Sequence, residues 1–150
     1  MKDLHSNISI VKGLTPQTVT SGGGAVNTGN VDLQGFNSAE IEFSIGAYLG
    51  YTLSGTNKFT VALTHAPDDG ARSPGDYANV EAADVLGVTP ATGVVFTIDA
   101  AAEDELVYRC GYVGGKRFIK VTITPNGTLT SGNPCAINII KGHPSDAPTS

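Results

Sequence analysis

The chain has no tryptophan, only two cysteines and no long apolar run. Cys110 and Cys135 form no CxxC pair, which argues against a zinc or redox site. In a chain made in the cytoplasm two buried thiols are the default, although a disulfide is geometrically possible if their strands are neighbours. No segment approaches the roughly 20 apolar residues that cross a bilayer, and the first residues lack the apolar stretch of a signal peptide. We therefore expect no membrane segment.

Charged residues are also scarce, and their net negative charge argues against a nucleic-acid-binding protein. Only 15% of the 150 residues are charged, and 14 acidic side chains against nine basic ones give a net charge of −5. Binding to nucleic acid requires clustered Lys and Arg that neutralise phosphates, so we expect no nucleic-acid partner. A hydrophobic content of 40% nevertheless excludes a disordered polymer, and the length suits one domain.

What the chain does have is alternation of apolar and polar residues, the period of half-buried antiparallel strands. It recurs in residues 7–12, 39–45, 58–65, 94–99, 106–113, 117–125 and 135–142. Short strands separated by turn clusters predict an all-β fold, an antiparallel, jelly-roll-like β-sandwich with one short helical excursion. The predicted core comprises Ile41, Phe43, Val61, Leu63, Phe96, Ile119, Val121 and Ile139.

The segments between the predicted strands differ in character. Residues 21–30 contain three consecutive glycines and predict a flexible loop. Residues 66–87 hold the helical excursion, of one or two turns, which begins near residues 74–76 and presents one face formed by Tyr77, Val80, Ala83 and Leu86. We expect one domain over residues 1–144, with residues 1–14 either its first strand or an arm, and a frayed tail at 145–150.

The segment GYVGGKRFIKVTITP, residues 111–125, superficially resembles a phosphate-binding loop. A phosphate-binding loop of the GxxxxGK type needs a following Ser or Thr and then a helix, whose first amides hold the phosphate. Here Gly111 stands four residues before Gly115, Arg117 replaces the hydroxyl residue, and a predicted strand follows. We interpret Gly114 and Gly115 instead as a tight hairpin turn that supplies positive φ angles.

Other chemistry-bearing residues form no recognisable constellation. The three histidines, His5, His65 and His143, are scattered. The acidic group between Asp99 and Glu105 lacks the glycine-centred alternation of a calcium loop, and Asp68-Asp69-Gly70 is typical of a turn. No GxSxG elbow occurs and neither cysteine has an evident histidine partner. We therefore expect no bound nucleotide or other cofactor, no metal and no catalysis.

Four strings of the sequence carry a resemblance to a known family. They are MKDLHSNISIVKGLTP at the start, GFNSAEIEFSIG in the middle, RCGYVGGKRFIKVTITP later and IKGHP near the end. Together they resemble small structural proteins of tailed phages and prophages, which are usually encoded close to the major capsid protein. The departures lie in three segments, residues 21–30, 66–87 and 126–134.

The resemblance implies a non-enzymatic virion protein that decorates or cements the outer capsid surface. It implies the major capsid protein as partner and a symmetric oligomer, most simply a trimer at local three-fold positions. The expected contacts are the N-terminal residues Leu4, His5 and Ile8, with Lys116 and Arg117 as a second group. Two alternatives stay open: a tail or head–tail connector subunit, and a carbohydrate-binding module that uses Tyr48, Tyr51 or Tyr77.

Overall fold

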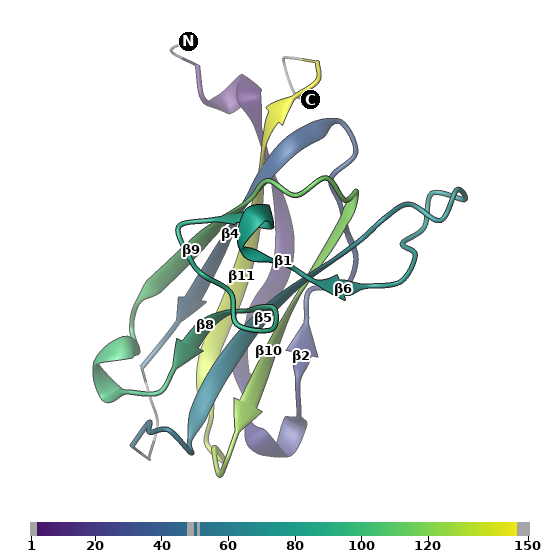
Figure 1. The fold of residues 1–150 in the computed structure, drawn as a ribbon. Coiled ribbons are helices and arrows are strands. Elements are labelled where there is room, and N and C mark those ends of the chain that lie inside the picture. The colour runs from purple at the N-terminus through teal and green to yellow at the C-terminus, as the bar shows by residue number, and fades with distance from the viewer. Residues whose placement is uncertain (1–2, 48–49, 51, 147–150) are drawn as a thin grey trace.

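Two antiparallel sheets pack face to face in the computed structural model of the chain, which describes residues 3–47, 50 and 52–146 (Figure 1). The predicted all-β sandwich is confirmed. Helical structure among the described residues is limited to four single 3-10 turns: η1 (His5–Asn7), η2 (Ser21–Gly23), η3 (Ala82–Asp84) and η4 (Ala101–Glu103).

The first sheet, sheet A, contains five strands, and the second, sheet B, contains six. In spatial order, sheet A consists of β1 (Ile8–Val19), β11 (Asn133–Pro144), β4 (Phe36–Ile45), β9 (Val107–Tyr112) and β7 (Val85–Leu86). Sheet B is centred on β10 (Phe118–Asn126) and β5 (Lys58–Ala66). Outside this pair, β2 (Val26–Asn27) and β3 (Val31–Asp32) join β10, whereas β6 (Ala78–Asn79) and β8 (Val94–Ile98) join β5.

The core lies between the sheets because each long strand turns alternate residues inward. Along β4, Ile41, Phe43 and Ile45 are buried, while the intervening Glu42 and Ser44 are only partly covered. All eight residues predicted for the core are buried. The alternation in the sequence therefore reports the inward face of each strand correctly.

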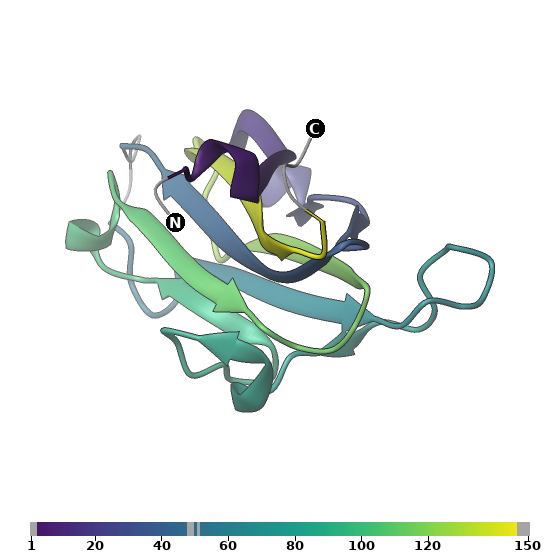
Figure 2. The same ribbon diagram turned by 90° about the horizontal axis from the view of Figure 1, so that it is seen from above.

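The predicted helical face in residues 66–87 is wrong. Tyr77 precedes the short strand β6, Val80 is buried, Ala83 lies in the three-residue turn η3, and Leu86 lies in β7. Pairing of β6 with β5 and of β7 with β9 supplies backbone hydrogen bonds that a short helix could not match. The loop between β5 and β6 projects from the body of the sandwich (Figures 1 and 2).

Residues 21–30, predicted as a flexible loop, contain the turn η2 and the strand β2. The Thr20 hydroxyl accepts a hydrogen bond from the Gly23 amide at 3.1 Å, which closes the turn. Asn27 and Val26 then pair with Thr122 and Ile123 of β10. Pairing with the distant strand β10 therefore gives residues 21–30 a defined structure that their glycine content alone did not predict.

The N-terminal segment enters the sandwich as its first strand. From Ile8 to Lys12, β1 pairs in regular register with β11, with Ile8 opposite Gly142 and Lys12 opposite Asn138. Residues 8–14 therefore follow the first-strand alternative, and η1 precedes them. This pairing places the beginning and the end of the described chain side by side, at one end of sheet A (Figure 1). Of the tail predicted to fray, residues 147–150 lie outside the described residues.

Candidate contact surface

One row of residues crosses the outer face of sheet A near the chain ends. The strand registers place Ile10 opposite Ile140, Ile140 opposite Glu40, Glu40 opposite Gly111, and Gly111 opposite Leu86. Their sequence neighbours Ile139, Ile41 and Cys110 lie in the core, so this row faces outward. Ile10 and Leu86 expose 66% and 58% of their surface. Large apolar side chains therefore stand on the face that should be most polar.

Two adjoining hollows lie at this end of the sheet. The larger, about 550 Å³, lies among η1, the start of β4 and the end of β11. The smaller, about 280 Å³, lies over the row itself, and both are lined by Ile8, Gly142 and His143. We call their combined lining the terminal surface: Leu4, Asn7, Ile8, Asn37, Ser38, Ala39, Glu40, Leu86, Gly111, Tyr112, Val113, Ile140, Gly142, His143, Pro144 and Ser145.

A fixed polar group stands in the middle of the terminal surface. The Ser38 hydroxyl lies 2.7 Å from Nδ1 of His143, and the Asn37 amide donates to the His143 carbonyl at 3.1 Å. These contacts hold His143 at a φ of 52°, a left-handed conformation that is uncommon for a residue other than glycine. The histidine is thus oriented by neighbours on β4, and the residue is exposed on the surface.

Beneath the smaller hollow, Tyr112 holds the loop of residues 113–117 in place. Its side chain is 1% exposed, and its hydroxyl lies 3.1 Å from Nδ1 of His65 and accepts from the Lys116 amide at 3.2 Å. Burial raises the pKa of Tyr112 to about 12, and the nearby Asp84 carboxylate acts in the same direction. A Cβ at Gly114 would lie 2.7 Å from the Tyr112 hydroxyl, so the loop packs closely enough to require glycine there.

The hairpin predicted at Gly114 and Gly115 is wrong. β9 pairs with β4 and β7 in sheet A, whereas β10 pairs with strands of sheet B, so residues 113–117 cross from one sheet to the other. Neither glycine is among the described residues with positive φ. Gly114 permits close packing against Tyr112 rather than a tight turn, whereas a Cβ at Gly115 would meet nothing within 4 Å. A strand, not a helix, follows it, as the sequence predicted.

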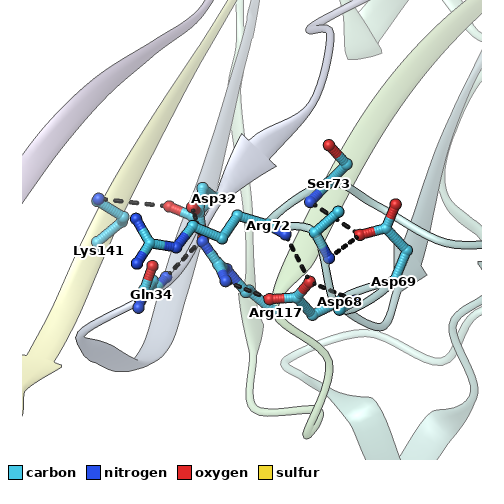
Figure 3. Close-up of polar contacts among 10 residues, drawn as sticks. Asp32, Gln34, Asp68, Asp69, Arg72, Ser73, Arg117 and Lys141 are labelled. Atoms are coloured by element: carbon cyan, nitrogen blue, oxygen red, sulfur yellow. Dashed lines mark hydrogen bonds and ion pairs between the residues drawn. The ribbon is translucent and has the colours of Figure 1, made fainter.

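Arg117 forms ion pairs with two carboxylates of the same chain, those of Asp32 and Asp68 (Figure 3). Its Nε and Nη2 donate to the two oxygens of Asp32 at 2.9 and 2.8 Å, and its Nη1 donates to Asp68. Hydrogen bonds from Arg117 hold the pKa of Asp32 below its usual range. The pKa of Asp68 is lowered as well, first by the hydrogen bond from the Gly70 amide and then by the charge of Arg117. In return, the hydrogen bonds to Asp32 and the charges of both carboxylates raise the pKa of Arg117. The network ties the base of the projecting loop to sheet B.

The predicted contact residues therefore fall into separate places. Leu4 and Ile8 line the terminal surface, and His5 is exposed beside them in η1. Lys116 is exposed on the loop that follows Val113, whereas the Arg117 guanidinium is occupied by Asp32 and Asp68. A role for these residues in contacts with a partner stays a prediction.

Sequence reasoning missed several residues of the terminal surface, among them Leu86, Ile140 and Ser38. The helical spacing places Leu86 on a helical face, whereas it lies exposed on β7, which makes it a candidate for contact with a partner. Ile140 follows the core residue Ile139, and the outward position of an isoleucine in an alternating strand was the signal available.

The other sequence candidates have structural roles in the described residues. Glu103 accepts hydrogen bonds from the amides of Asp99 and Ala100, which closes the turn η4. No group of three His, Cys, Asp or Glu side chains in the described part of the chain is arranged to hold a metal. Of the tyrosines considered for sugar binding, Tyr48 and Tyr51 lie outside the described residues, and the Tyr77 ring is covered by Lys120 Nζ at 4.0 Å.

The two cysteines are free thiols on strands that are not neighbours. Cys110 lies on β9 and Cys135 on β11, which flank β4 on opposite sides. Both are buried, and burial raises the pKa of each thiol to about 12. Neither is suited to act as a nucleophile, because the reactive species is the thiolate.

Comparison with known proteins adds no assignment. No protein-family model matches the chain, and no curated protein shows significant similarity to it. No helix among the described residues is long and apolar enough to span a bilayer. What the geometry offers is an apolar, shallowly hollowed face with one oriented histidine, an arrangement suited to binding another macromolecule.

Proposed function

We propose that the protein is a non-enzymatic structural component of a tailed-phage-like particle, which decorates or cements the outer surface of the capsid. The major capsid protein is the proposed partner, and the terminal surface is the proposed site of attachment. The protein acts there as a small symmetric oligomer, most simply a trimer at local three-fold positions.

One observation carries this proposal: the four strings that resemble the phage family meet at the terminal surface. The opening string supplies Leu4, Asn7 and Ile8, and the closing string supplies Ile140 and residues 142–144. The central string supplies residues 37–40, and the third supplies residues 111–113. Segments far apart in the chain that share a resemblance and also share a surface are best explained by a common contact.

The physical character of the terminal surface supports attachment to a protein. Exposed apolar side chains gain free energy when a partner covers them, and Leu4, Leu86 and Val113 are 70%, 58% and 42% exposed. The net charge of −5 suits the outside of a shell, whereas packed DNA inside would repel it. A layered β-fold supplies a rigid body on which such a surface keeps its shape.

The test uses capsids that lack the protein and measures how many labelled copies bind to each particle. Leu4→Asp and Leu86→Asp should each weaken binding, because a charge would be buried against the capsid. Thr97→Asp, an equal charge added at an exposed position on β8 of sheet B, is the matched control and should bind as the unmodified protein does.

A cryo-electron density map of the decorated particle then locates the protein. Density on the outer shell, with the terminal surface against it, supports the proposal. Density on tails or at the neck would instead support the tail or connector alternative. Equal binding by Leu4→Asp, Leu86→Asp and Thr97→Asp would remove the terminal surface as the attachment site.

A further inference from the structure

Sheet A ends in two open strand edges that face away from each other. On one side β1 has β11 as its only strand partner in the described residues. On the other side β7 covers β9 only at Gly111 and Tyr112, so Val107–Arg109 pairs with β4 alone in the part of the chain that the structure describes. Figure 2 shows β1, in purple, and β9, in green, on opposite sides of β11 and β4. Each edge presents backbone groups that another strand can bind.

Parts of both edges are regular enough to accept another strand, and each carries one exposed cation, Lys12 on β1 and Arg109 on β9. The second half of β1 is irregular, with register shifts after Lys12 and Leu14 and a proline at position 16. The first half, up to Lys12, pairs regularly with β11 and carries the exposed Ile10. The β9 edge has no proline and exposes 65% of Val107. Open, regular and apolar edge segments are sites of strand addition.

The strand directions allow the two edges to meet in successive copies. Every pairing in sheet A is antiparallel, in the order β1, β11, β4, β9. β1 and β9 therefore run in opposite directions. If β1 of one copy lies beside β9 of another in the same orientation, the alternation continues without a break. The strand directions thus permit a sheet that spans two copies, provided that η1 turns away from β7, which occupies the β9 edge at Gly111 and Tyr112.

Charge selects a second copy of this chain as the occupant. Residues 4–31 contain no Asp or Glu, so β1 approaches a partner with Lys12 as its charged residue. The β9 edge begins immediately after the acidic residues 103–105. Lys12 of one copy is therefore attracted to acidic residues 103–105 of another, while Arg109 on the β9 edge has no acidic residue of β1 to face.

We propose that the β1 edge of one copy pairs with the β9 edge of a second copy, with Ile10 opposite Val107. Both side chains stand on the outer face of the sheet. Ile10 lies opposite Ile140, next to the core residue Ile139, and Val107 lies opposite Ser44, next to the core residue Phe43. The same register brings Lys12 toward Glu105, which lies in the bend before β9 with a φ of 53°, so the two opposite charges attract without forming a cross-strand pair. In other registers Lys12 or Ile10 lies opposite Arg109 or Val107, and Lys12 is not brought toward Glu105.

Such an interface is heterologous, since it joins different surfaces of the two copies. Repetition therefore produces a closed ring where the rotation permits and a linear chain where it does not. This inference does not depend on the proposed function, because the oligomer forms from the purified protein without a capsid. Its test uses Lys12 and Glu105, which lie outside the terminal surface, although the same register places Ile8 of that surface opposite Arg109.

The first test is a charge exchange, followed by sedimentation of the purified protein over a range of concentrations. Lys12→Glu and Glu105→Lys should each raise the dissociation constant about three- to tenfold, and the double variant should restore it. Lys116→Glu, which reverses an exposed cation outside both edges, should leave it unchanged. A monomeric unmodified protein at every concentration, or no restoration in the double variant, overturns the proposal.

The second test identifies the strands by oxidative cross-linking. Ile10→Cys and Val107→Cys proteins should form a covalent dimer when mixed and not when oxidised separately, and the native thiols are buried and do not interfere. Ile10→Cys mixed with Thr97→Cys is the control for random collision. A dimer of Ile10→Cys alone would show two-fold pairing of β1 with itself and overturn the proposal, as would equal cross-linking in the control.

Discussion

Replacing Phe43 by alanine tests the packing of the sandwich at its centre. The side chain is 0% exposed and lies between Ile137 of β11 and Tyr108 of β9 in sheet A. Its ring is 6.4 Å from the ring of Phe96 across the core and 6.0 Å from that of Tyr108. Removing a fully buried phenyl ring loses its transfer free energy and leaves a cavity, which together cost about 3–5 kcal/mol. We expect Phe43→Ala to lose that much free energy of unfolding.

Urea unfolding, followed by circular dichroism, measures this loss as a lower midpoint at an unchanged m value. Phe36→Ala is the matched control, because Phe36 begins the same strand, is only half-buried and lies beneath Lys141 Nζ at 4.4 Å. It should lose about 1 kcal/mol or less. Equal losses in the two variants, or a loss below about 1 kcal/mol for Phe43→Ala, would refute the inward orientation of β4.

Three further results are expected from the folded protein. Cys110 and Cys135 should not react with a thiol reagent near pH 8 until the protein unfolds, because burial raises the pKa of both thiols to about 12; fast reaction in the native state would contradict this. Stability should fall on acidification below about pH 4. The pKa values of Asp32 and Asp68 are lower in the folded than in the unfolded protein, so their ionised forms stabilise the fold above the unfolded pKa. This contribution is lost as the pH falls through the folded pKa. Arg117→Gln should flatten that decline in urea midpoints, and an unchanged slope would contradict the pairing. A chelator should leave the melting temperature unchanged, since a drop of many degrees would reveal a structural metal.

The sequence by itself determined the inward face of each long strand. Alternation with a period of two depends only on which residues of a strand are buried, so Val61 and Leu63 on β5 and Ile119 and Val121 on β10 could be assigned to the core without knowing what they touch. The same local signal predicted the sandwich, because many short alternating segments can bury their apolar faces only in two packed layers.

Only the tertiary structure decided which strands pair and which distant residues meet. The glycine pair at 114 and 115 marks a break between strands, but whether those strands pair or part depends on competition from β4 and β5. Arg117 binds Asp32, 85 residues away, and no local pattern indicates that contact. The terminal surface likewise joins segments from across the chain, because pairing energies depend on every strand at once whereas periodicity depends on one.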